Sequence, residues 1–173
     1  MKNLLKTLET LHRAFDEAEI GHALIGGLAL EYLGVHHTTV GIDLLVDGEV
    51  GHKAIKTLQE LGFEPHSESG EAMQFTGDID VHILLANRTP TRMMLKTAHP
   101  IKDLGIKCVG PEDIIGLKIE AYMNNPSREA QDKADIIALM EKHPSLDWDK
   151  IKGYADLFGE WPVIEKLRKE NEL

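Results

Sequence analysis

The chain has 173 residues and a net charge of −10 at pH 7. This length predicts one compact domain, or a core with a small helical appendage. The acidic composition lacks the basic footprint of a protein that binds duplex DNA, which favours a nucleotide or another small molecule as the partner. A single cysteine, Cys108, excludes an internal disulfide framework and a cysteine-rich zinc site. The sequence shows no signal peptide and no apolar run near 18 residues, which predicts a cytoplasmic protein that does not span a membrane.

The first predicted elements are a helix, a strand, a second helix and a second strand. Apolar residues at helical spacing predict a helix over residues 2–18, and the short apolar run His22–Ile25 suits a buried strand. Residues 28–33 have helical character, so Gly26 and Gly27 lie at a strand-to-helix junction. Glycines permit a tight turn and a close approach to a ligand there, and a helix N-terminus offers free N–H groups to a phosphate.

Asp43 lies inside the second apolar strand, which is predicted over residues 42–46. An aspartate has no packing role at such a position. An unpaired buried carboxylate is costly in free energy, which favours a metal ion or another cation as its partner.

Helices and strands continue to alternate through the first 110 residues. Helices are predicted over 50–61 and 89–98, and strands over 63–66, 72–76, 77–85, 101–104 and 106–109. From Pro111 onward the pattern is wholly helical. The sequence therefore predicts a mixed α/β core over residues 1–110, with helices on at least one face of the sheet, and a helical segment over residues 111–173 packed on it.

The strand predicted over residues 77–85 carries further polar residues. With period-2 alternation, Asp78, Asp80 and His82 would project from one face, about 6.6 Å apart at successive positions. Two other interpretations stay open: Asp78 as a turn residue after Gly77, and Asp80 as a solvated strand residue.

The glycine pair and the aspartates together resemble the active-site signature of the nucleotidyltransferase superfamily, which includes DNA polymerase beta, the minimal nucleotidyltransferases and the AbiEii-type toxins. In these families a glycine pair precedes two aspartates, separated by one apolar residue on a strand, and a third acidic residue lies on a neighbouring strand. By this resemblance, Asp43 is the second aspartate and Asp80 the third. The first aspartate is replaced by Gly41, and an arginine of the AbiEii-like pattern by His37.

The helical segment also resembles the AbiEii-like group. The residues from Pro111 to Lys118 are similar to its "Pro-Glu-Asp-Leu, two residues, Leu-Lys" segment, and Arg128, Asp132 and Asp135 match its "Arg, then Asp, x, x, Asp" helix. Lys118 is a cation in an otherwise apolar helix, where it could reach a triphosphate; the alternative is a packed stem with its ammonium in solvent. Arg128 and Asp132 stand four residues apart, which predicts a surface ion pair.

The resemblance implies that the chain binds a nucleoside triphosphate with Mg²⁺ or Mn²⁺ and transfers a nucleoside monophosphate to an acceptor. The resemblance implies that Asp43 and Asp80 are catalytic residues and metal ligands, with Asp78 as a further metal ligand. It implies Gly26, Gly27 and Lys118 as nucleotide-binding residues. His37, His82 and Arg128 are additional candidates.

Gly41 leaves two functions open. Nucleotidyl transfer uses two cations held about 4 Å apart by bridging carboxylates, so the loss of one carboxylate favours a single metal ion over a catalytic pair. The chain is then either a transferase with an incomplete carboxylate triad or a non-catalytic nucleotide-binding or regulatory module. That module could be one half of a toxin–antitoxin pair with a protein partner.

The nine histidines do not predict a histidine metal site. His36 and His37 are adjacent, so on a strand they would point in opposite directions, and neither forms a helical zinc pair at i, i+4. The scattered members of the set are interpreted as solvated or turn residues: His12, His52, His66, His99 and His143.

Overall fold

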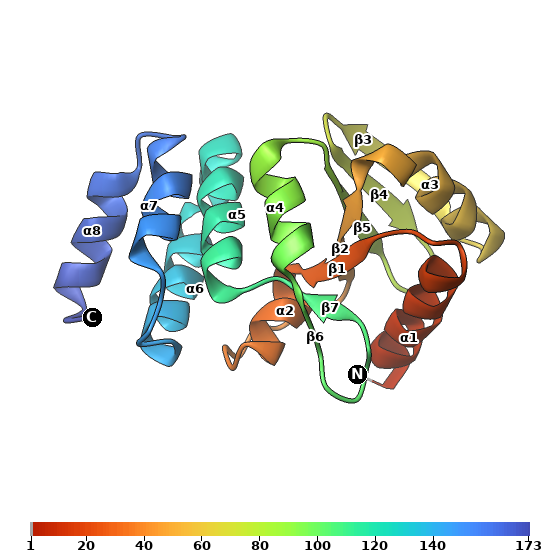
Figure 1. The fold of residues 1–173 in the computed structure, drawn as a ribbon, viewed down its shortest axis with the longest axis horizontal. Helices are drawn as coiled ribbons and strands as arrows, with labels where there is room; N and C mark the ends of the chain where they lie inside the picture. The colour runs from red at the N-terminus through yellow and green to blue at the C-terminus, as the bar shows by residue number, and fades with distance from the viewer. Residues whose placement is uncertain (1) are drawn as a thin grey trace. The chain divides into compact units, whose positions relative to one another are not determined.

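The computed structural model describes residues 2–173, and its contacts divide the chain into two compact units (Figure 1). The first, which we call the α/β unit, contains the residues up to Ala29 together with His37–Val109. The second, the helical unit, contains Leu30–His36 and Gly110–Leu173. Residues 30–36 therefore group with the helical part of the chain, whereas the sequence predicted a simple division after residue 110.

A seven-stranded mixed sheet forms the α/β unit, in the order β3-β4-β5-β2-β1-β7-β6. Its strands are β1 (His22–Ile25), β2 (Ile42–Asp47), β3 (Glu64–Ser69), β4 (Ala72–Thr76), β5 (Val81–Ala86), β6 (His99–Pro100) and β7 (Lys107–Cys108). The pairs β2–β5 and β1–β7 are parallel, and the other pairs are antiparallel. The predicted mixed α/β class is confirmed.

Helices of the α/β unit cover parts of this sheet. They are α1 (Lys2–Glu17), α3 (Gly51–Glu60), which follows the short helix η1 (Gly48–Val50), and α4 (Thr89–Thr97); α2 (Gly26–Tyr32) begins in this unit. α4 lies against β2 and β5, and α1 lies against α3. The helical spacing predicted for α1 is confirmed, because Leu4, Leu8, Leu11 and Phe15 are all buried.

The central strands bury both faces, which explains their continuous apolar sequence. Leu44, Leu45 and Val46 of β2 are fully buried between β1 and β5, as expected for a strand covered on both sides. Outside this run, Asp43 and Asp47 are half-buried. Asp43 and Asp47 are therefore the two polar exceptions in a strand that otherwise belongs to the core.

Two predicted strand boundaries are wrong. β5 begins at Val81, after a bend at Gly77, Asp78 and Ile79, so neither Asp78 nor Asp80 lies in the strand that carries His82. The strand predicted over 101–104 is absent, since residues 102–104 form a turn, and β6 lies before it at His99–Pro100; the strand predicted over 106–109 is shortened to β7. Asp103 and Gly105 both have φ of +75° there, a left-handed conformation that interrupts a strand.

The helical unit consists mainly of four helices after Val109, as the sequence predicted. They are α5 (Pro111–Asn124), α6 (Glu129–Lys142), preceded by η2 (Pro126–Arg128), α7 (Trp148–Asp156) and α8 (Trp161–Glu170). α5 contacts both α6 and α7. Buried Asp113 ties α5 to α7, because it accepts from the Tyr154 hydroxyl at 2.6 Å and pairs with Lys150 Nζ at 2.7 Å. Burial, together with the hydrogen bond to Asp113, raises the pKa of Tyr154 above its usual value.

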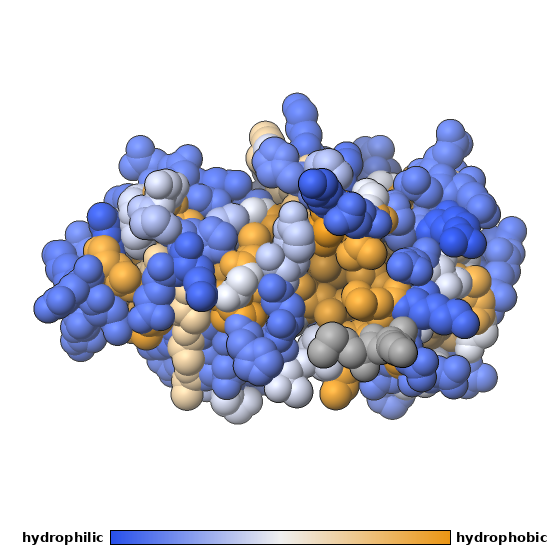
Figure 2. All heavy atoms as spheres, turned by 90° about the horizontal axis from the view of Figure 1, so that it is seen from below, coloured by the Kyte–Doolittle hydropathy of each residue, from blue (hydrophilic) through white to orange (hydrophobic). Residues whose placement is uncertain are grey.

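One face of the molecule shows how polar and apolar residues are distributed on the surface. On the face seen in Figure 2, hydrophilic residues predominate and surround a patch of hydrophobic ones. Among residues 2–173, no helix is both long enough and apolar enough to cross a membrane.

Candidate functional site

Gly26 lies in close contact with β2, at the point where the backbone leaves β1. It has φ of +67°, a left-handed conformation that glycine adopts at little cost. The adjacent Ile25 pairs with Asp43 of β2, and an added Cβ at Gly26 would lie 2.1 Å from Asp43 Oδ2. No side chain other than hydrogen fits there, so the sequence needs glycine for both its φ and its contact with Asp43.

Gly27 is equally constrained by the segment before β2. A Cβ at this position would lie 2.7 Å from Thr39 Cβ and 3.0 Å from His37 Cδ2. The Thr39 hydroxyl also donates to the Gly41 carbonyl at 3.1 Å, which fixes the chain as it enters β2. His37, an additional candidate, therefore lies beside the glycine pair. Thr39 was not among the predicted residues, although its place in a polar run before the strand was a usable signal.

Asp43 makes its principal side-chain contact with His82. The two residues are direct partners in the parallel pairing of β2 with β5. His82 Nδ1 donates to Asp43 Oδ1 at 2.8 Å, and the two side chains are 45% and 27% exposed. His82 was predicted only as an additional candidate, and the register explains its position: directly opposed residues on parallel strands project to the same side of the sheet. The partly exposed Asp43 carboxylate stays accessible to a ligand.

Asp80 precedes β5 and is exposed. Its backbone carbonyl accepts from Ile42 N at 2.9 Å, so Asp80 stands beside the start of β2, where Gly41 lies. A Cβ added to Gly41 would lie 3.9 Å from Asp80 Cβ and 3.1 Å from the Asp80 carbonyl oxygen. A side chain at position 41 would therefore lie next to the Asp80 side chain. Asp43 follows two residues later, so side chains at positions 41 and 43 would project to the same face.

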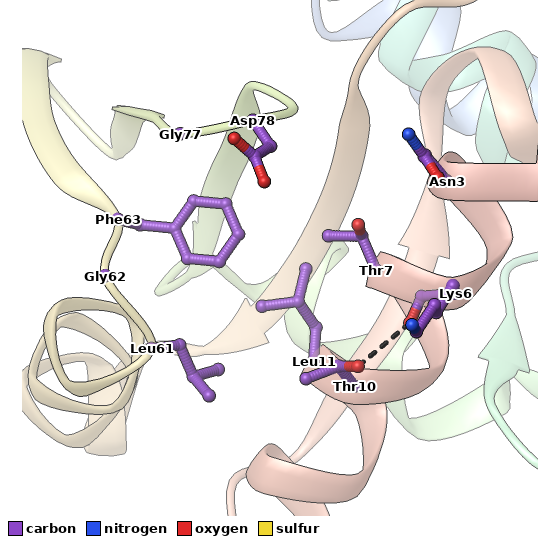
Figure 3. Close-up of a pocket in the computed structure, with 10 residues that line it drawn as sticks. All are labelled: Asn3, Lys6, Thr7, Thr10, Leu11, Leu61, Gly62, Phe63, Gly77 and Asp78. Carbon is purple, nitrogen blue, oxygen red and sulfur yellow. Dashed lines mark hydrogen bonds between the residues drawn. The ribbon is translucent and has the colours of Figure 1, made fainter.

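Asp78 lines a different feature, a cavity of about 510 Å³ (Figure 3). The cavity lies between α1 and the segment after α3, and Asp78 faces it beside Phe63. A Cβ at Gly77 would lie 2.7 Å from the Phe63 ring, so glycine is needed for this bend. Of the predicted site residues, Asp78 alone lines this cavity, and its role as a metal ligand stays a prediction.

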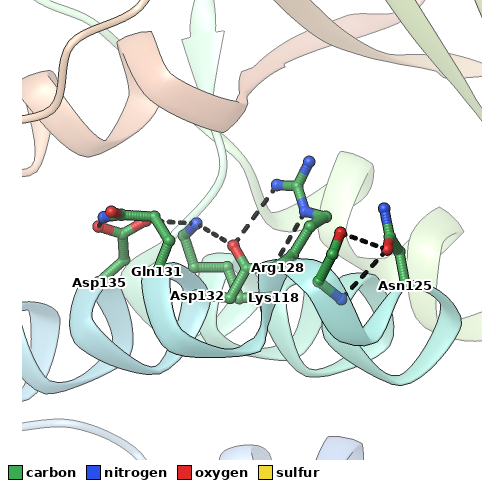
Figure 4. A network of polar contacts seen from close by, with 7 residues as sticks. Lys118, Asn125, Arg128, Gln131, Asp132 and Asp135 are labelled. Carbon is green, nitrogen blue, oxygen red and sulfur yellow. Dashed lines mark hydrogen bonds and ion pairs between the residues drawn. The ribbon is translucent and has the colours of Figure 1, made fainter.

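Lys118 belongs to a buried ionic network within the helical unit (Figure 4). Its Nζ lies 2.8 Å from Asp132 Oδ1 and 2.6 Å from Asp135 Oδ2, and the residue is 8% exposed. The predicted Arg128–Asp132 pair is confirmed at 3.1 Å, but Asp132 is buried and not on the surface. The alternative interpretation of Lys118, an ammonium in solvent, is wrong. Its role as a nucleotide ligand stays a prediction.

Replacing Gly26 with alanine is expected to disrupt the site locally. The added methyl carbon would overlap the Asp43 carboxylate, and alanine disfavours φ of +67°. We expect the variant to lose about 1–3 kcal/mol of unfolding free energy, measured by urea denaturation. Gly70→Ala is the matched control, since Gly70 has φ of +60° but nothing within 4 Å of an added Cβ. An equal loss in both variants would contradict a specific clash with Asp43.

Comparison with known proteins identifies the fold. No known protein family matches the sequence, and no curated protein matches it either. Among solved structures, the antibiotic-resistance factor ANT(2″)-Ia superposes with a TM-score of 0.67 at 17% identity, covering 96% of this chain and 97% of that one. A second structure of ANT(2″)-Ia, in complex with adenylyl-2″-tobramycin, gives 0.66 at 18% identity over 89% and 95% of the two chains.

A further match comes from a fungal protein. An antigenic nucleotidyltransferase-like protein from Paracoccidioides brasiliensis superposes with a TM-score of 0.57 at 21% identity, covering 96% of this chain and 93% of that one. These structural superpositions cover both units of this chain and nearly the full length of each matched protein. The chain therefore has the nucleotidyltransferase fold.

Proposed function

We propose that the α/β unit binds a nucleoside triphosphate together with Mg²⁺ or Mn²⁺, and that it transfers a nucleoside monophosphate to an acceptor at a low rate. The observation that carries the proposal is the contact of Gly26 with Asp43. A left-handed glycine lies directly against a half-buried carboxylate on the neighbouring strand, in the fold of nucleotidyltransferases. The Asp43 side chain is 27% exposed, so its carboxylate is accessible to a ligand beside the glycine turn.

The residues present fit one divalent cation better than two. Asp43 and Asp80 supply carboxylate oxygens, the donors that Mg²⁺ prefers, and both are accessible. His82 orients Asp43 through its Nδ1 proton, as partners of ligating carboxylates do in metal sites. When bound, a cation at these residues would neutralise charge on the phosphates. Gly41 offers no third carboxylate, which is the reason for the low rate that we propose.

Each residue of the chain then has a distinct task. Gly26 and Gly27 lack the side chains that would block a phosphate, and their backbone is held by contacts with Asp43 and Thr39. The hydrogen bond from His82 fixes the orientation of the Asp43 carboxylate before any ligand arrives. Because the carboxylate is already oriented, less conformational entropy is lost when a ligand binds.

A non-catalytic nucleotide-binding or regulatory module is the second candidate. Gly41 favours it directly, because the position that would carry the first aspartate has no side chain. The additional toxin–antitoxin role depends on the AbiEii-like motifs alone. None of the three matched structures is named for a toxin or an antitoxin, so they provide no support for an antitoxin partner.

The acceptor that we propose to test first is a small hydroxylated cation. One matched structure holds adenylyl-2″-tobramycin, which is an adenylylated aminoglycoside. The net charge of −10 suits a cationic acceptor and disfavours a nucleic-acid one. Tobramycin is therefore the natural first member of an acceptor panel, followed by uncharged sugars and a cellular RNA extract.

Binding of ATP is expected to depend on both Mg²⁺ and Asp43. Isothermal titration calorimetry should show binding with Mg²⁺, and an affinity lower by about tenfold or more when the metal is chelated or when Asp43 is replaced with alanine. Asp149→Ala is the matched control, because it removes the same charge from an exposed position of the helical unit. Equal affinity in the wild type and Asp43→Ala, with and without metal, would disprove the proposed pocket.

A further inference from the structure

Three potential metal ligands meet where α1 packs against β1, outside the proposed nucleotide site. His12 and Asp16 are four residues apart on α1, so they lie on one face of the helix. His22 is the first residue of β1 and is 7% exposed. One ligand atom from each residue can be chosen so that all three lie within 4.8 Å of one another. All three belong to the α/β unit.

The two imidazole rings are already oriented toward a common point. His22 Nδ1 lies 2.7 Å from the Ile20 carbonyl oxygen, and since a carbonyl only accepts, this nitrogen carries the proton. The lone pair of His22 Nε2 is therefore directed at His12 Nδ1, 2.8 Å away. Donation of the other ring proton to a backbone carbonyl is the usual arrangement of a metal-ligating histidine, because it fixes both tautomer and ring orientation.

The surroundings of His22 hold its ring in place beside a cavity. Phe15 holds the ring edge-on, with centroids 5.3 Å apart. The three residues also line a cavity of about 320 Å³ that includes Gly105 and Lys107 and has room for water to complete a coordination shell. The nearby positive charge of Lys107 opposes a bound cation, whereas Asp16 offsets it.

We propose that His12, Asp16 and His22 bind a divalent transition-metal ion of the Zn²⁺ class, with solvent at the remaining position. Imidazole nitrogen and carboxylate oxygen suit zinc, and three protein ligands plus water is a recurring zinc arrangement. In the metal-free protein the proton on His12 Nδ1 is shared with His22 Nε2. On binding, it moves to His12 Nε2, so both facing nitrogens ligate and no proton is lost from the pair.

The geometry needs only a small adjustment to receive the ion. Ligand nitrogens at about 2.0–2.1 Å from a tetrahedral metal lie about 3.3 Å apart, so the rings must separate by about 0.5 Å. The site is separate from the proposed nucleotide site, because His22 begins β1 and Gly26 follows its last residue, so β1 separates them by about 13 Å. An ion here would join α1 to β1, so its expected effect is on stability.

Titration of the chelator-treated full chain with Zn²⁺ tests the proposal. We expect one-to-one binding, and a rise in unfolding temperature of about 5 °C or more at a metal concentration 100-fold above Kd. His12→Gln and Asp16→Asn should each weaken binding at least tenfold while leaving the metal-free unfolding temperature within about 2 °C of wild type. Co²⁺ should give the visible absorption of a tetrahedral ion in the wild type and not in His12→Gln.

Two control variants locate the bound ion. Asp43→Asn alters the proposed nucleotide site, and His66→Gln changes an exposed histidine of β3, so both should bind Zn²⁺ as the wild type does. Wild-type affinity in His12→Gln would overturn the proposal. So would a loss of binding in Asp43→Asn, because the ion would then lie at Asp43 and His82.

Discussion

Replacing Gly41 with aspartate is expected to raise the rate of nucleotidyl transfer by about 100-fold. A second bridging carboxylate can contribute several kcal/mol of transition-state stabilisation, and each 1.4 kcal/mol is about tenfold in rate. The new side chain would begin 3.9 Å from Asp80 Cβ and two positions before Asp43. The variant would thus place three carboxylates around one point. A radiolabel-transfer assay with each nucleoside triphosphate, Mg²⁺ and the acceptor panel measures the change.

The same substitution carries a steric cost that needs its own control. A Cβ at position 41 lies only 3.1 Å from the Asp80 carbonyl oxygen, so the entry to β2 must shift by a few tenths of an ångström. Gly41→Asn imposes nearly the same cost without the negative charge. We expect this variant to show no gain in rate, which would assign the gain in Gly41→Asp to metal binding.

The possible results separate the two proposed functions. A gain in Gly41→Asp over an inactive or slow wild type would identify a transferase that has lost a carboxylate. A substantial wild-type rate that falls in Asp78→Ala would show instead that Asp78 supplies the missing charge. If both proteins bind ATP but neither transfers label to any acceptor in the panel, the result favours the nucleotide-binding module.

Replacing Lys118 with methionine is expected to cost about 3–5 kcal/mol of unfolding free energy. The change removes the ammonium that pairs with both Asp132 and Asp135. Asp132 keeps its ion pair with Arg128, whereas Asp135 keeps a hydrogen bond from Gln131, and the loss of the cation from a buried ion pair is strongly destabilising. For a chain of this size the unfolding temperature should fall by about 10 °C. Urea denaturation followed by circular dichroism measures the loss.

An exposed pair on α6 provides the comparison. Lys133→Met removes a lysine that is 25% exposed and whose partner, Glu129, lies one turn away. Its ammonium also lies 5.4 Å from the centre of the Tyr122 ring, so we expect a loss of about 1 kcal/mol, the pair itself contributing about 0.3–0.5 kcal/mol. A triple variant with Lys118→Met, Asp132→Asn and Asp135→Asn should recover much of the loss, since no charge then stays buried alone. A loss below about 1 kcal/mol in Lys118→Met would contradict the structural role of the network.

Much of the fold follows from local sequence. The apolar spacing of α1 and the apolar run of β1 predict their elements closely, because one buried stripe or run is the dominant local signal. The glycine pair and Asp43 were also chosen as candidate site residues from the sequence, since a charged residue in an apolar strand and glycines at a strand-to-helix junction can be recognised from the order of residues alone. The predicted strand at Asp78 failed because Gly77 packs on Phe63, a contact between distant residues.

The sequence by itself determined the fold class, the order of most elements and the residues around which the nucleotide site is proposed. Only the tertiary structure decided which side chains meet. The register of β2 on β5 pairs Asp43 with His82, the packing of α5 on α6 pairs Lys118 with two aspartates, and the packing of α1 on β1 brings His12 to His22. His12 was interpreted from sequence as a solvated or turn histidine, but it lies in α1, is half-buried and has its Nδ1 2.8 Å from His22 Nε2. Pairing between distant segments depends on strand register and helix packing, which periodicity within one segment does not encode.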